Sequence, residues 1–150
     1  MKNRLVNTKF WTDKYIVTLD PDAKLLFLYF LSNQLTNIAG IYEITIRQMV
    51  FDTGLTVPTL NKYLKQFQDD NKIYYLFEYG WVYIKNFQKN QTLNPSVITG
   101  IAKAIEETPK RILDALEKLD KEFVPMRRSP GDYLRKIQSL KIENPVKGMK

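Results

Sequence analysis

Cysteine and histidine are both absent from the 150 residues of this chain. Without cysteine there can be no disulfide and no thiol nucleophile, and without either residue the usual ligands of zinc and the commonest general base are missing. The 6 glycines are scattered, so the sequence lacks a glycine-rich loop that could cradle a phosphate. We therefore expect a protein that is not an enzyme and that holds no metal or other cofactor.

Long hydrophobic runs are absent as well. The longest apolar stretch, Leu25 to Leu31, is far shorter than the ~20 residues needed to span a bilayer. Residues Met1–Leu5 do not contain the apolar core of a signal peptide. These features predict a cytoplasmic protein that does not bind a membrane, and the lack of cysteine fits a reducing compartment.

Acidic residues are outnumbered by basic ones. The chain has 23 Lys and Arg against 16 Asp and Glu, which gives a net charge of +7 and a pI near 9.5. Much of the surplus lies near the C-terminus, where residues 121–150 hold 8 basic and 3 acidic side chains, a net of +5. Nucleic acid is the first candidate partner for such a chain, although charge alone also fits a small basic protein that binds none.

The stretch from Thr45 to Phe87 has the most informative pattern. Thr45 is a plausible N-cap for a short helix over residues 46–53, and Gly54 follows where a left-handed residue can end that helix. Thr56 can cap a second helix with Pro58 in its first turn. Its expected buried face consists of Val57, Leu60, Leu64 and Phe67.

Two β-rich runs follow this second helix. Residues 72–77 and 81–87 are aromatic and β-branched, and Glu78–Gly80 between them predicts a hairpin turn. Helix, tight turn, helix and hairpin is the order of parts in a winged helix-turn-helix. We expect residues 41–44 to form a short strand that pairs with this hairpin, or wing. The predicted fold is therefore mostly α with a small β-hairpin.

Further helices flank this unit on both sides. Asp20 as the N-cap and Pro21 as the first residue predict a helix through Asn33. Its apolar face of Leu25, Leu28 and Tyr29 serves either the core or a dimer contact. Asn94–Pro95 opens another helix, Thr108–Pro109 interrupts it, and a second amphipathic segment follows. The expected apolar positions of these two segments are Val97, Ile98, Ile101, Ile105, Ile112, Leu113, Leu116, Leu119 and Phe123.

These patterns divide the chain into three parts. We predict a winged helix-turn-helix domain over residues 1–90, a helical extension over 91–123, and a basic, partly disordered tail over 124–150. A further short helix with its apolar face is compatible with residues 132–140 of the tail.

The polar face of the second helix of the pair is the candidate DNA-reading surface. It offers hydrogen-bonding side chains for base edges and lysines for phosphates, with threonines at the helix start and further cations on either side. The candidate DNA-binding residues are Arg47, Thr56, Thr59, Asn61, Lys62, Lys65, Gln66 and Lys72. Lys85 and Lys89, on or beyond the second wing strand, are weaker candidates.

Two features argue for other interpretations. Asp69 and Asp70 balance Lys62 and Lys65, so the helix is neutral overall. The wing is more aromatic than basic, and its rings either stack on unpaired bases or fill a core or an oligomer interface. The wing aromatics are Tyr74, Tyr75, Phe77, Tyr79, Trp81 and Tyr83.

Several blocks of this sequence resemble a known family. The chain is similar to the N-terminal winged-helix domain of phage replication initiators, or replisome organisers, and more distantly to the N-terminal domain of the DnaD primosome proteins of low-GC Gram-positive bacteria. The similarity spans about residues 4–108. It is carried by Asn7–Trp11, Lys24–Tyr29, Gly40–Ile44, Thr53–Leu55, Trp81–Phe87, Gln91 and Asn94–Pro95.

The resemblance implies a phage or prophage protein that binds an origin, self-associates and helps to load the replicative helicase. Double-stranded DNA is the partner that it implies, with single-stranded DNA and a helicase loader as further candidates. Family members usually continue into a C-terminal domain, whereas this sequence ends in a basic segment. Two alternatives stay open: an oligomerisation or protein-interaction scaffold with the same fold, and a transcriptional regulator that makes the same DNA contacts.

Overall fold

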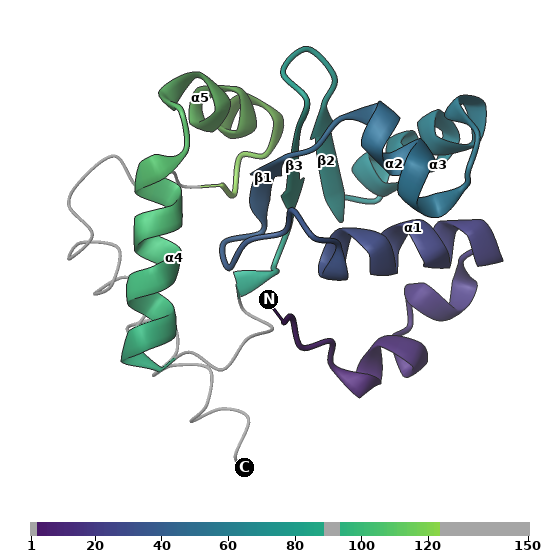
Figure 1. Cartoon of the computed structure of the whole chain (residues 1–150), viewed down its shortest axis with the longest axis horizontal. Coiled ribbons are helices and arrows are strands. Elements are labelled where there is room, and N and C mark those ends of the chain that lie inside the picture. The colour runs from purple at the N-terminus through teal and green to yellow at the C-terminus, as the bar shows by residue number, and fades with distance from the viewer. Residues whose placement is uncertain (1–2, 89–93, 124–150) are drawn as a thin grey trace.

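The computed structural model describes residues 3–88 and 94–123 (Figure 1). Lys89 and the predicted tail, residues 124–150, lie outside the described residues. The described part is mostly helical, with one small antiparallel sheet, as the sequence predicts. In chain order its elements are η1 (Thr8–Thr12), η2 (Ile16–Thr18), α1 (Pro21–Ser32), β1 (Ile41–Glu43), α2 (Ile46–Thr53), α3 (Val57–Asp69), β2 (Ile73–Leu76), β3 (Trp81–Ile84), α4 (Pro95–Glu107) and α5 (Lys110–Leu119).

Short polar side chains start three of the helices at the predicted positions. The side-chain oxygens of Thr45, Thr56 and Asn94 each accept a hydrogen bond from the backbone N–H three residues later, at 2.9 to 3.3 Å. Asp20 is different, because its carboxylate makes no capping bond. It accepts instead from the hydroxyl of Tyr63 in α3, at 3.0 Å, so Asp20 holds the predicted N-cap position without a capping hydrogen bond from its side chain.

The three strands are antiparallel in the order β1-β3-β2. In the central strand, Tyr83 lies between Ile41 of β1 and Tyr74 of β2. A four-residue loop joins β2 to β3, and its last residue, Gly80, takes a positive φ of 71° while its N–H donates to the carbonyl of Leu76. The predicted hairpin and its pairing with β1 are both confirmed.

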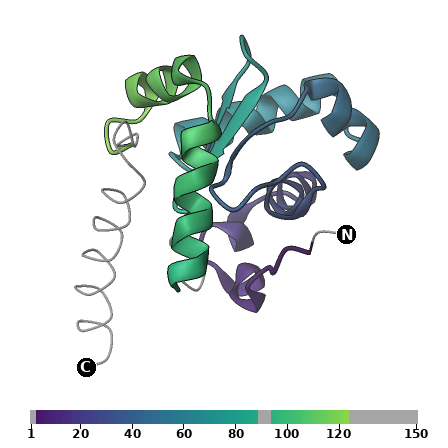
Figure 2. The same ribbon diagram turned by 60° about the vertical axis from the view of Figure 1, so that its left-hand side comes forward.

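Both faces of this sheet are buried. Successive strand side chains point to opposite faces, so Tyr75 and Val82 pack toward α1, α2 and α3, whereas Tyr74 and Tyr83 pack toward α4 and α5. Figures 1 and 2 show α1, α2 and α3 on one side of the sheet and α4 with α5 on the other. Residues 94–123 therefore belong to the same packed body as the sheet.

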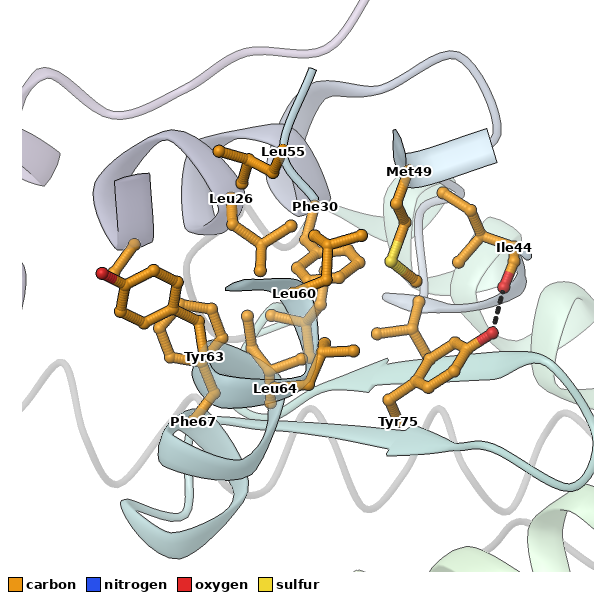
Figure 3. Close-up of a cluster of buried hydrophobic side chains, with 14 of the residues drawn as sticks. Leu26, Phe30, Ile44, Met49, Leu55, Leu60, Tyr63, Leu64, Phe67 and Tyr75 are labelled. Carbon is orange, nitrogen blue, oxygen red and sulfur yellow. Dashed lines mark hydrogen bonds between the residues drawn. The ribbon is translucent and has the colours of Figure 1, made fainter. Parts of the chain in front are cut away.

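The α-helical core is organised around α1 and α3. Leu60, Leu64 and Phe67 of α3 are buried and meet Leu26 and Phe30 of α1 (Figure 3). Burial of side chains of this size contributes about 1.5–3 kcal/mol each relative to leaving them exposed. This packing fixes which face of α3 is turned outward.

Three apolar positions differ from the sequence prediction. Leu25 is 44% exposed, and α1 buries Ala23, Leu26 and Phe30 in its place, because a helix that is apolar nearly all round gives no periodic signal for its buried face. Val57 is 46% exposed because it lies in the first turn of α3. Leu119 is 43% exposed at the last residue of α5.

A buried ion pair joins the end of α5 to the sheet. Lys85, just after β3, places its Nζ 3.4 Å from Oδ1 of Asp120 and 3.2 Å from Oε1 of Glu122. The side chains of Lys85 and Asp120 are only 9% and 5% exposed. Tyr83 adds a hydrogen bond from its hydroxyl to Oδ2 of Asp120, at 3.5 Å.

Gly40 lies where the loop before β1 meets Phe87. Its φ is +74°, and a Cβ atom there would lie 2.6 Å from the Cβ of Phe87. Gly54 has a similar φ of +77° but nothing within 4 Å of such an atom. Comparing an alanine substitution at Gly40 with one at Gly54 therefore separates the cost of backbone strain from the cost of a steric clash.

We expect Gly40→Ala to lower the free energy of unfolding by about 3 kcal/mol, because it combines left-handed strain with a clash in a packed region. Gly54→Ala is the matched control and should cost only about 1 kcal/mol, from backbone strain alone. Urea denaturation of both variants measures this difference. Equal losses would show that the contact with Phe87 relaxes without cost.

Lys85→Met should lower the free energy of unfolding by about 3 kcal/mol, because it leaves the buried Asp120 carboxylate without its cation. Lys118→Met, at an exposed position of α5, is the control and should change it by less than about 0.5 kcal/mol. Burial opposes the charge of Lys85, but the hydrogen bonds and charges of Glu122 and Asp120 outweigh it and raise its pKa above 10.5.

The pKa of Lys85 also predicts how this loss depends on pH. A group whose pKa is raised on folding stabilises the fold fully below its unfolded-state pKa and loses that effect as the pH rises through its folded-state pKa. The difference in unfolding free energy between the wild type and Lys85→Met should therefore stay constant up to about pH 10.5 and shrink above it. A constant difference at every pH would contradict this assignment.

Candidate nucleic-acid interface

A tight turn sets α2 and α3 against each other. Gly54 ends α2 in the left-handed conformation, and its N–H donates to the carbonyl of Val50 at 2.9 Å. Leu55 then turns inward and is buried, and Thr56 begins α3. The turn is therefore anchored on its inner side, which leaves the outer side of α3 facing solvent.

The structure confirms that most of the predicted reading face is accessible. Asn61, Lys62 and Lys65 are exposed along the outer side of α3, and Thr56 is exposed at its start. Thr59 is half-buried and accepts a hydrogen bond from the hydroxyl of Thr56, at 3.0 Å. Helix geometry brings these side chains onto one surface.

The two lysines of this face make contacts within the helix. The Nζ of Lys62 lies 5.2 Å from the centre of the Tyr63 ring, a cation–π contact. The Nζ of Lys65 forms an ion pair with Oδ2 of Asp69 at 2.8 Å. Lys65 is therefore matched by a carboxylate one turn further along α3.

Lys72 and Arg47 lie apart from the start of α3. Lys72 follows α3, and its Nζ lies 4.9 Å from the centre of the Tyr15 ring. The 13 residues of α3 span roughly 20 Å, so Lys72 and Thr56 mark opposite ends of the helix. Arg47 is exposed on the first turn of the neighbouring α2. The eight candidate residues therefore do not form one compact cluster.

The segment before α1 contributes to the C-terminal end of α3. The hydroxyl of Tyr15 donates to Oδ2 of Asp70 at 2.7 Å, and its ring packs on Phe27. Gln66, near the same hydroxyl, is half-buried. Sequence reasoning missed Tyr15 as a neighbour of α3, because nothing local relates residues that lie 55 positions apart.

Tyrosine–aspartate hydrogen bonds recur around α1, α2 and α3. Besides the pair of Tyr15 and Asp70, Tyr29 of α1 donates to Oδ2 of Asp52 in α2 at 2.5 Å. Burial and the neighbouring carboxylate both raise the pKa of Tyr29, with burial the larger cause. The hydrogen bond from Tyr29 in turn lowers the pKa of Asp52. These bonds connect α1 to α2 and the segment before α1 to the end of α3.

The described residues carry as many acidic as basic side chains. The net charge of +7 therefore comes from Lys2, Lys89 and residues 124–150, all outside the described part. The exposed hydrogen-bond donors of α3 and the excess of basic residues therefore lie in different parts of the sequence. Such a division separates side chains that could read bases from side chains that could attract phosphates.

The wing differs most from the sequence hypothesis. Tyr74, Tyr75 and Tyr83 are at most 8% exposed, so these rings cannot stack on unpaired bases. Their role is in the core, which was the other reading of the aromatic wing. The prediction that Lys85 contacts DNA is wrong, because its side chain is buried in the ion pair with Asp120.

An exposed ring remains in the hairpin loop. Phe77 is 59% exposed and meets Tyr75 edge-to-face, with ring centres 4.9 Å apart. In the same loop, the centre of the Tyr79 ring lies 5.9 Å from the guanidinium of Arg111 in α5. No sequence signal relates Arg111 to the wing, because α4 and α5 reach the hairpin only through tertiary packing.

Within residues 3–88 and 94–123, no group of three acidic side chains is placed to hold a metal ion. None of the described helices is long and apolar enough to cross a bilayer. No family model, curated protein or solved structure matches this chain. Proposals for function therefore depend on the sequence and on this geometry.

Tyr29→Phe should lower the free energy of unfolding by about 1 kcal/mol, because it removes the hydrogen bond to Asp52. The raised pKa of Tyr29 stabilises the fold fully below the unfolded-state pKa of 10.0, and the effect is lost as the pH rises above it. The wild type should therefore lose more stability above pH 10 than Tyr29→Phe does, which thermal denaturation across this range measures.

Asp52→Asn provides the test of the partner. If Tyr29 acts through Asp52, the two substitutions together should cost less than the sum of their separate effects. Additive losses would show that the hydrogen bond contributes nothing to stability.

Proposed function

We propose that this chain is a non-enzymatic DNA-binding protein of phage or prophage replication initiation, and that residues 1–90 form a winged helix-turn-helix. The exposed polar side of α3 is the observation that carries the proposal. It follows a tight turn from α2 and precedes a hairpin, which is the order of parts in that fold. The buried side of α3 is held by Leu60, Leu64 and Phe67, so the polar side stays outward.

The proposed mechanism is insertion of α3 into the major groove. In helix-turn-helix proteins the start of the second helix meets base edges, and here that end carries Thr56, Thr59 and Asn61. Amide and hydroxyl groups of this kind can hydrogen bond to bases, while Lys62 and Lys65 reach phosphates on either side. Gln66 is half-buried against Tyr15 and is the weaker of the base-reading candidates.

Attraction to the duplex must draw on charge outside the described residues. Residues 124–150 are basic in sequence, and cations of this kind supply the salt-dependent, sequence-independent part of DNA affinity. In the proposal they hold the chain near DNA while α3 selects a site. Arg47 and Lys72 are proposed as phosphate contacts at the two ends of the helix pair.

The role in replication rests on the resemblance to phage replication initiators. It includes origin binding, self-association and assembly of the replisome, with a helicase loader and single-stranded DNA as further candidate partners. A transcriptional regulator would make the same contacts with DNA. Footprinting on phage DNA would separate the two, because an initiator protects an origin and a regulator protects a promoter.

A protein-interaction scaffold is the second candidate. Two observations favour it: the described residues have no net charge, and several large apolar side chains are exposed, including Phe51 at 83% and Trp11 at 60%. Under this alternative the protein should show a concentration-dependent mass and no affinity for DNA. Analytical ultracentrifugation with and without a DNA duplex tests that outcome.

Replacing both Lys62 and Lys65 by Ala should weaken duplex binding and flatten its salt dependence, because fewer counterions are released. Each phosphate contact that is lost should reduce the slope of log K against log salt by about 0.9. Fluorescence anisotropy at several salt concentrations measures both quantities.

The matched control replaces Lys103 and Lys118 by Ala, which removes two exposed cations from α4 and α5. This variant has the same net charge as the first, so equal weakening would indicate a general charge effect. Unchanged affinity of the Lys62 and Lys65 variant at every salt concentration would remove α3 from the binding site.

A further inference from the structure

The C-terminal end of α3 carries charge of the wrong sign for a helix. Asp69 is its last residue and Asp70 its C-cap, and within this described helix no basic residue lies in the last turn. Acidic side chains at a helix C-terminus oppose the macrodipole. Helix stability therefore does not explain why Asp69 is there.

The ion pair of Asp69 with Lys65 does not supply an explanation either. Its N–O distance is 2.8 Å, but the two side chains remain 61% and 76% exposed. Exposed pairs of this spacing are worth only about 0.3–0.5 kcal/mol, and a lysine placed before its acid on a helix is the less favourable order. The pair contributes little to the fold, yet it neutralises a cation at the centre of the candidate reading face.

We propose that Asp69 restrains sequence-independent binding of DNA by holding Lys65 in an intramolecular ion pair. This inference rests on the proposed function, since it concerns the same face of α3. Non-specific affinity for DNA is almost entirely electrostatic, so a lysine already paired with a carboxylate adds little to it. Polar contacts from Thr59 and Asn61 to base edges do not depend on this pair, so neutralising Lys65 favours selective over non-selective binding.

The ion pair also determines where the Lys65 side chain points. Lys65 reaches toward the end of α3 at Asp69, away from the helix start where Thr56 and Asn61 lie. A phosphate must displace the carboxylate to gain the lysine. Displacement is favoured only when other contacts hold a phosphate close to Lys65, which a matched site does more often than a random one.

Asp69→Asn tests the proposal with a mixed-sequence DNA duplex as the probe. Release of Lys65 should add at most one phosphate contact, which steepens the slope of log K against log salt by up to about 0.9. The exposed pair is worth only about 0.3–0.5 kcal/mol, so its loss should raise the affinity for the duplex about twofold. Fluorescence anisotropy of the full chain measures both values, and circular dichroism confirms that the variant is folded.

Asp70→Asn is the matched control. It removes the same charge from the neighbouring position, but Asp70 accepts a hydrogen bond from Tyr15 and pairs with no lysine in the described structure. Its gain in affinity should be clearly smaller than that of Asp69→Asn. Equal gains would overturn the proposal, because they would reflect net charge alone.

The same substitution on a Lys65→Ala background completes the cycle. Asp69→Asn should then have little further effect, and a full gain without Lys65 would overturn the proposal. If Lys62→Ala weakens binding while Asp69→Asn changes nothing, the inference fails and the proposed function stands. If no variant binds the duplex at any salt concentration, both fail.

Discussion

Burial of both faces of the small sheet is the constraint on which the rest of this structure depends. Tyr74 and Tyr83 are amphipathic aromatic residues on the face that a free wing would expose to solvent, and there they would leave a large apolar surface in water. Helices α4 and α5 cover that face with Ile101, Ile105 and Ile112. The opposite face needs α1, α2 and α3 for the same reason, so the sheet connects two helical layers.

This constraint has consequences for the candidate function. A hairpin that is buried on both faces can present only its loop to a partner, which leaves the exposed polar side of α3 as the candidate surface. The described residues carry no net charge, and the acids Asp52, Asp69 and Asp70 lie around α2 and α3. Affinity and selectivity would therefore come from different parts of the chain, with the cationic surplus outside the described part.

Prediction from sequence succeeds where the determining interaction is local. Thr45, Thr56 and Asn94 start their helices because each side chain reaches an N–H only three residues away. The exposed donors of α3 follow from helical periodicity in the same way. Prediction fails for the side chain of Asp20, which holds the N-cap position but bonds to Tyr63, and for Leu25, whose helix is too uniformly apolar to show its buried face.

The sequence by itself determined the order of the α-helices and strands, because capping residues, glycines and hydrophobic periodicity act over a few positions. It also determined the absence of cysteine and histidine chemistry and the basic balance of the chain. Tertiary structure alone decided that the wing rings are internal, that Lys85 pairs with Asp120, and that Tyr15 meets Asp70. Those contacts join residues 35 and 55 positions apart, and only the packing of whole layers brings them together.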